Sequence, residues 1–218
     1  GSIPEYRYTY LRRSLVWTET RMFDEKIYRR FNHTVAACFV IYFLFPQKIM
    51  GLERIYLVIL LWVIILGIEY LRLNKNLNLF GMRDYESDRI AGFVWFASGT
   101  FIILGFYEMG AFPQSLAIAT IIMAAYTDPV IGEANLKLGD RWGLGIGFVC
   151  SFAIYQLIIG VIFYSVLGGL IAVLVERPKL KWFDDDLAMQ IFPISILSIL
   201  WLSGIGPDLP ETIIGSGL

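Results

Sequence analysis

The chain has 218 residues, of which 57% are hydrophobic and only 17% are charged. Soluble domains contain about 45–50% apolar and about 25% charged residues, so this composition indicates an integral membrane protein. The formal net charge of −1 lacks the basic excess of a nucleic-acid-binding protein, and the length predicts a single domain.

Residues 1–32 precede the first apolar run and form a basic lead-in. Seven Lys and Arg residues alternate there with Tyr, Trp and Phe. This mixture is typical of an amphipathic segment lying on an anionic membrane surface, and a solvated tail is the alternative.

Apolar runs then fill residues 33–203, which we expect to form one transmembrane bundle followed by a short tail, 204–218. We expect helices, because unpaired backbone amides are too costly in lipid. The expected apolar runs are 33–47, 54–71, 89–107, 113–126, 144–175 and 187–203.

The run 144–175 decides the number of spans. As one helix it would be about 48 Å long, which exceeds an apolar core of about 30 Å. Two crossings with a turn near Gly160 would each be short, but they place Arg177, Lys179 and Lys181 on the cytoplasmic side. We therefore expect two crossings, which gives an all-α bundle of about seven spans; six spans is the alternative.

Basic residues alternate between successive loops, and this alternation predicts the orientation. Lys and Arg are frequent before residue 33, around the second loop, in 127–143 and in 176–186, whereas 108–113 contains none. We expect the N terminus and the loops 127–143 and 176–186 to be cytoplasmic, and the C terminus to lie outside.

Acidic residues gather at the ends of the expected spans. Three buried Asp residues would cost about 8–10 kcal/mol in the apolar layer, so Asp184–Asp186 must lie at an interface or in a wet cavity. One interpretation is a solvated helix N terminus, and the other is a Mg²⁺ site. Seven crossings bring further carboxylates to the same face. The expected metal ligands are Asp128, Glu176, Asp184, Asp185 and Asp186.

The segment GDRWGLGIG, residues 139–147, opens the next run. Glycine-rich backbone at a helix N terminus can hold phosphate, and Lys137 and Arg141 would add positive charge. The segment lacks the P-loop pattern, and the four-residue spacing of Gly143 and Gly147 also suits helix packing alone.

Four pieces, in order, resemble the family of dolichol kinase, phytol kinase and CTP-dependent diacylglycerol kinase. They are RRFNH (29–33), GIEYLRL with RDYE (67–73 and 83–86), TDPVIGE (127–133) and LIAVLVERPKLKWFDDDLAMQIFP (170–193). The family's Lys-[Ser/Thr]-x-x-Gly-Ser segment has no counterpart, and Asp186 replaces the usual Asn.

The resemblance implies a membrane kinase that transfers the γ-phosphoryl group of CTP, with Mg²⁺, to a polyprenol, dolichol, other isoprenoid or diacylglycerol hydroxyl at the cytoplasmic face. A cytidylyltransferase acting on a lipid phosphate and a small transporter are the alternatives. The expected catalytic carboxylates are Asp128, Glu133 and Asp185. The expected nucleotide-binding residues are Arg30, His33, Arg83, Lys137, Arg141, Gly143 and Gly145.

Overall fold

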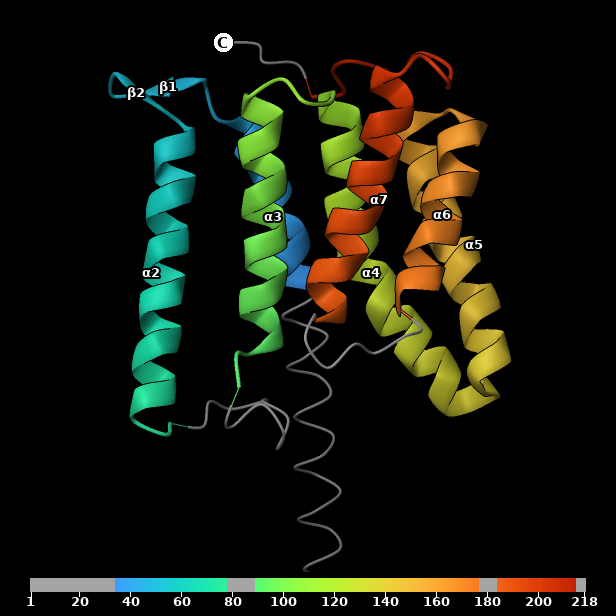
Figure 1. The fold of residues 1–218 in the computed structure, drawn as a ribbon, viewed down its shortest axis with the longest axis horizontal. Helices are drawn as coiled ribbons and strands as arrows, with labels where there is room; N and C mark the ends of the chain where they lie inside the picture. The colour runs from blue at the N-terminus through green and yellow to red at the C-terminus, as the bar shows by residue number, and fades with distance from the viewer. Residues whose placement is uncertain (1–33, 78–88, 177–183, 215–218) are drawn as a thin grey trace, which may run out of the picture.

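The computed structural model describes residues 34–77, 89–176 and 184–214, and this part of the chain is mostly helical (Figure 1). The basic lead-in 1–32 therefore lies outside the described residues. A short helical segment is followed by a two-stranded hairpin and then by six α-helices. In chain order the elements are η1 (Cys38–Leu44), β1 (Lys48–Ile49), β2 (Leu52–Glu53), α2 (Ile55–Asn74), α3 (Gly92–Glu108), α4 (Gln114–Leu138), α5 (Asp140–Ile159), α6 (Ile162–Glu176) and α7 (Asp185–Leu202).

Successive α-helices run in opposite directions (Figure 1). We call the end of the bundle at which α2, α4 and α6 finish the lower end, and the opposite end the upper end, as oriented in Figure 1. Helices α3, α5 and α7 begin at the lower end, so residues far apart in the sequence meet there.

Among the described residues, four helices are long and apolar enough to cross a membrane: α2, α4, α5 and α7. The helical segment Thr34–Leu44 and helices α3 and α6 are apolar but shorter. A mostly helical membrane protein is thus compatible with the structure, as the composition predicted.

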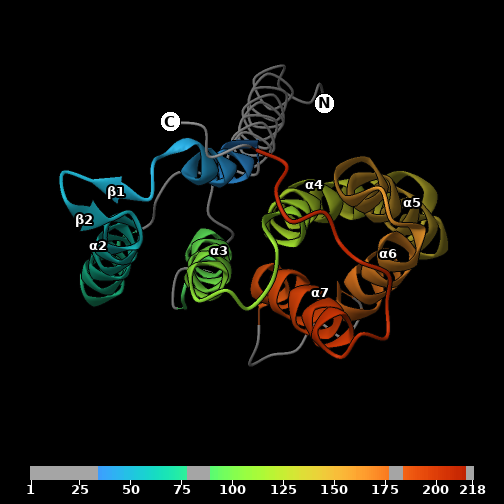
Figure 2. The same cartoon turned by 90° about the horizontal axis from the view of Figure 1, so that it is seen from above.

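Helix α7, the last helix described, lies between α3 and α6 when the bundle is seen from above (Figure 2). It packs against α3, α4 and α6, and α4 through α7 form a group when seen from above (Figure 2). Helix α2 lies at the edge beside α3, and only 17% of its apolar window is buried. Most of the α2 surface is therefore available to lipid.

The predicted turn inside the long apolar run is confirmed. Helix α5 ends at Ile159, and Gly160 adopts a left-handed conformation with φ of +74° before α6 begins at Ile162. A residue with a Cβ would be strained in that conformation, so glycine stops one helix and lets the next turn back.

The predicted loop 127–143 is wrong. Helix α4 continues through Pro129 to Leu138, and only Gly139, with φ of +90°, separates it from α5. The proline removes one backbone donor, but helix-forming residues follow it, and Glu133 and Lys137 form an ion pair of 2.8 Å one turn apart.

Polar contacts tie the upper end together. Arg54 donates to Glu108 at 2.8 Å and to the carbonyl of Phe45, while the Tyr42 hydroxyl donates to the same Glu108 carboxylate at 2.6 Å. This network joins η1, α2 and α3.

The C-terminal segment also belongs to the bundle. The Gln114 side chain accepts from the amides of Ile213 and Ile214, and Leu209 is buried. The segment therefore passes back over the upper ends of the helices (Figure 2).

Candidate functional site

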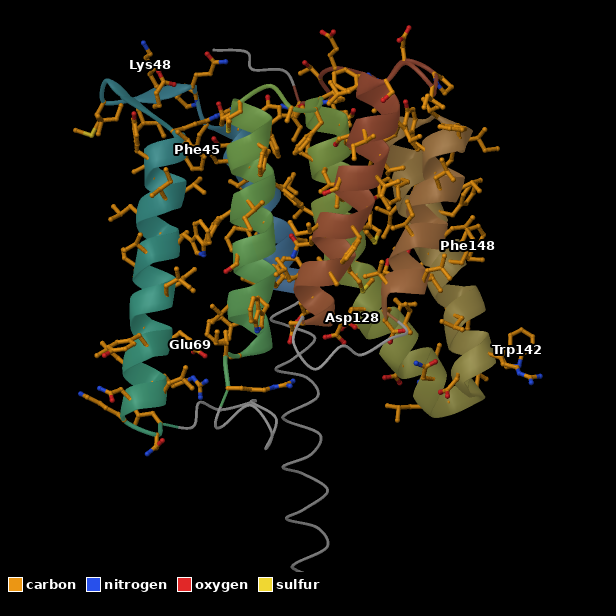
Figure 3. All side chains as sticks on the ribbon, in the orientation of Figure 1. Phe45, Lys48, Glu69, Asp128, Trp142 and Phe148 are labelled. Carbon is orange, nitrogen blue, oxygen red and sulfur yellow. The ribbon has the colours of Figure 1, made fainter. Side chains whose placement is uncertain are left out.

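Carboxylates from three helices lie toward the lower end of the bundle. Asp128 comes from the second half of α4, Glu176 is the last residue of α6, and Asp185 and Asp186 form the first turn of α7. Figure 3 shows Asp128 beside the lower end of α7. Because α7 packs against both α4 and α6, the fold brings these chain segments together.

Asp184 caps the N terminus of α7. Its carboxylate accepts from the Asp186 amide at 3.1 Å, so the acidic cluster lies at a helix N terminus. Burial and, to a lesser degree, the neighbouring charge of Asp185 raise the pKa of Asp184 to about 6, although the hydrogen bond from the Asp186 amide and the charge of Arg89 oppose the shift. Negative charge is therefore crowded and partly desolvated at this point.

A buried ion pair fixes the adjoining corner between α2 and α3. Arg72 donates to Glu69 through two nitrogens, at 2.8 and 2.7 Å, and both side chains are almost fully buried. Glu69 also accepts from the Ala91 amide, and Arg72 donates to the Arg89 carbonyl at 2.6 Å. The two charges thus pair inside the protein and not at its surface.

Two of the predicted nucleotide-binding cations, Lys137 and Arg141, lie beyond Asp128 toward the tip of the α4–α5 hairpin. Lys137 is nine residues beyond Asp128 on α4, a distance of about 14 Å along a helix. Arg141 follows across the turn and is exposed, as is Lys137. The structure therefore places these two residues at the far tip of the α4–α5 hairpin, and the continuation of α4 past Pro129 is the reason.

The glycines near the start of α5 pack against α4. The Gly143 amide donates to the Gly139 carbonyl at 3.1 Å, so it already has a partner within the helix. A Cβ at Gly143 would overlap Asn135, and one at Gly147 would overlap Ile131, whereas Gly145 has open space. Helix packing, the alternative interpretation of this segment, accounts for Gly143 and Gly147.

Three predicted nucleotide-binding residues, Arg30, His33 and Arg83, lie outside the described residues. Within residues 34–77, 89–176 and 184–214, no group of three or more His, Cys, Asp or Glu side chains could hold a metal ion. The carboxylates of α4, α6 and α7 thus share an end of the bundle without forming a closed ligand cage.

A buried polar cluster that was not predicted lies between α3 and α7. The Gln190 side chain accepts from the Thr100 hydroxyl at 2.9 Å and donates to the carbonyls of Phe96 and Asp186. Gly99 leaves the space that the Gln190 amide fills. The available signal was a glutamine within an apolar run, because such a residue needs a hydrogen-bonding partner in the bundle.

Comparisons with known protein families, with curated proteins and with solved structures found no match to this chain. The class that the structure itself supports is a mostly helical protein with four helices suited to crossing a membrane.

Proposed function

We propose that the chain is an integral membrane protein of seven crossings whose lower end faces the cytoplasm. The alternating helix directions support this topology, and the three shorter apolar helices would then cross as well (Figure 1). The orientation rests on the sequence. Lys and Arg are frequent before residue 33, around the second loop and in 176–186, and basic segments of this kind usually face the cytoplasm.

We further propose that the protein is a lipid-alcohol kinase that uses CTP. The observation that carries this proposal is the gathering of carboxylates from α4, α6 and α7 toward one end of a membrane-compatible bundle. The family resemblance of the sequence supplies the donor and the class of acceptor, an isoprenoid alcohol or diacylglycerol.

The carboxylates suit the chemistry of phosphoryl transfer. The acceptor hydroxyl would attack the γ-phosphorus, the bond to the bridging β-phosphate oxygen would break, and CDP would leave. Asp128 or Asp185 would accept the hydroxyl proton, with Glu133 as the third candidate, although its contact with Lys137 places it nearer the hairpin tip. The hydroxyl would reach this end while its apolar tail stays in lipid.

The donor set also fits Mg²⁺. The start of α7 offers only carboxylate oxygens, which are hard ligands, and Mg²⁺ in kinases needs one or two carboxylates besides water and phosphate oxygens. Asp184 and Asp185 would hold the ion, with Asp128, Glu176 and Asp186 as further candidates. Bound Mg²⁺ would supply positive charge that neutralises the phosphates.

A transfer assay in proteoliposomes tests the proposal. The protein is supplied with CTP labelled at either the α- or the γ-phosphorus, with ATP as comparison, and with a panel of lipid alcohols and lipid phosphates. A kinase transfers the γ label to an alcohol. Transfer of the α label to a lipid phosphate, with release of pyrophosphate, would instead show a cytidylyltransferase.

Two variants connect the activity to the site. Asp128→Asn and Asp185→Asn should lower turnover at least about 100-fold, because a lost ligand removes stabilisation of the transition-state charge. Asp140→Asn, an exposed acid at the hairpin tip, is the matched control and should keep its activity. Equal turnover of all three variants would remove these carboxylates from the site.

A further inference from the structure

The turn between α4 and α5, residues 136–142, presents apolar side chains to its surroundings. We call these seven residues the hairpin tip; all of them are exposed. The exposed fractions are 76% for Leu136, 56% for Leu138 and 66% for Trp142. Exposed leucines and a tryptophan at one turn are costly in water and mark an interaction surface.

The apolar surface continues from the tip along α5. Trp142, Val149 and Leu157 are spaced by seven and eight residues, which places them on one face of the helix, and all three are exposed. Gly143 and Gly147, by contrast, pack against α4. The face that carries Trp142 therefore belongs to the surface that α5, a candidate membrane span, presents to lipid.

The hairpin tip lies at a level similar to that of the polar end of α2, which is a second indication of a membrane boundary. In Figure 1 the hairpin tip and the lower end of α2 reach a similar level, beyond the lower ends of α3, α6 and α7. Helix α2, the most lipid-exposed candidate span, ends there with Asn74 and is followed by Lys75 and Asn76. A polar end of this kind is where a span leaves the apolar layer.

The net charge of the hairpin tip shows whether ionic attraction to lipid or the burial of apolar side chains would hold the tip at a membrane. Within the tip, Lys137, Asp140 and Arg141 sum to +1, and Glu133, one turn earlier, pairs with Lys137 at 2.8 Å, so little net charge is left to attract anionic lipid. The long stems of Lys137 and Arg141 can still extend their charged groups toward phosphates while Trp142 lies among the glycerol groups.

We propose that the hairpin tip is seated in a lipid headgroup layer, with Leu136, Leu138 and Trp142 as its apolar anchors; this inference rests on the proposed crossing of the bilayer by α4 and α5. The partner is the phospholipid surface itself, and neutral phosphatidylcholine suffices. The anchoring does not depend on the chemistry proposed for the carboxylates.

Depth measurements by electron paramagnetic resonance test this proposal. The full chain, with Cys38 and Cys150 replaced by Ser, carries one nitroxide label at Trp142→Cys and is reconstituted in phosphatidylcholine liposomes. The accessibility of the label to oxygen and to a nickel chelate is calibrated with spin-labelled lipids. The label should lie within about 5 Å of the phosphate level, the width expected of an interfacial side chain.

Val149→Cys is the matched control on the same face. Seven residues of helix correspond to about 10 Å, so this label should lie about 10 Å deeper if α5 is close to the membrane normal. Leu138→Cys gives a second tip position if Trp142→Cys fails to fold.

Two results would overturn the proposal. One is accessibility of the tip labels to the nickel chelate equal to that in bulk water. The other is spin–spin broadening at the tip that disappears on dilution with unlabelled protein, since that result would assign the surface to a second copy of the chain.

Discussion

The contact between α4 and α5 predicts opposite effects for two neighbouring glycines. Gly147→Ala places a methyl group against Ile131, whereas Gly145→Ala enters open space. Both positions lie inside α5, so both substitutions gain the same helix propensity, about 1 kcal/mol.

The expected difference follows from these two contributions. Overpacking of a tight contact costs about 1–3 kcal/mol. Gly145→Ala should therefore stabilise the protein by up to about 1 kcal/mol, and Gly147→Ala should be neutral or destabilise it by up to about 2 kcal/mol. The difference between the two variants, about 1–3 kcal/mol, isolates the overlap with Ile131.

Unfolding by SDS in mixed micelles, followed by circular dichroism, measures both free energies. Combining Gly147→Ala with Ile131→Ala should recover part of the loss, because the shorter side chain removes the overlap, and a double-mutant cycle separates this coupling from the cost of truncating Ile131. Equal free energies of unfolding for Gly145→Ala and Gly147→Ala would refute the packing role of Gly147.

Three further predictions concern other parts of the bundle. Glu69→Gln should lower the free energy of unfolding by about 3–5 kcal/mol, since it breaks a buried ion pair, whereas Glu53→Gln, in an exposed pair, should cost at most about 1 kcal/mol in the same assay. The free energy of unfolding should fall as the pH rises from about 4 to about 6, because the folded protein keeps a proton on Asp184 that an unfolded Asp, with a pKa of about 3.9, has released. Thermal unfolding at both pH values should show a smaller fall for Asp184→Asn, and an unchanged fall would assign the effect to another group. Gln114→Ala should speed amide hydrogen exchange at Ile213 and Ile214, measured by mass spectrometry, and protection equal to that of the parent protein would show that the Gln114 hydrogen bonds do not hold the C-terminal segment.

Much of the helical order follows from local features of the sequence. The apolar runs gave the number and approximate bounds of the helices, and Gly160 marked the turn between α5 and α6. The error at the end of α4 also has a local cause. An Asp-Pro pair usually signals a helix end, but a proline inside a membrane-suited helix is tolerated when neighbouring groups satisfy the freed carbonyl.

The candidate site was less accessible to prediction, because its geometry depends on contacts between distant segments. The sequence showed acids at the ends of apolar runs, and alternating helix directions placed Asp128, Glu176 and Asp184 toward one end. The spacing of residues along the chain does not predict that α4 continues past Pro129 and so separates Lys137 from Asp128. It also does not predict which groups form hydrogen bonds with Gln190.

The packing of α7 against three earlier helices has a consequence for the assembly of the bundle. The helix occupies residues 185–202 of 218, yet it packs against α3, α4 and α6, and its Gln190 satisfies the hydroxyl of Thr100. The helices made before α7 must therefore leave its place open until α7 itself has been synthesised. Thr100 and Gln190 are 90 residues apart, so the hydroxyl of Thr100 lacks this hydrogen bond until then, and a chain shortened before α7 would leave this polar group of α3 uncovered.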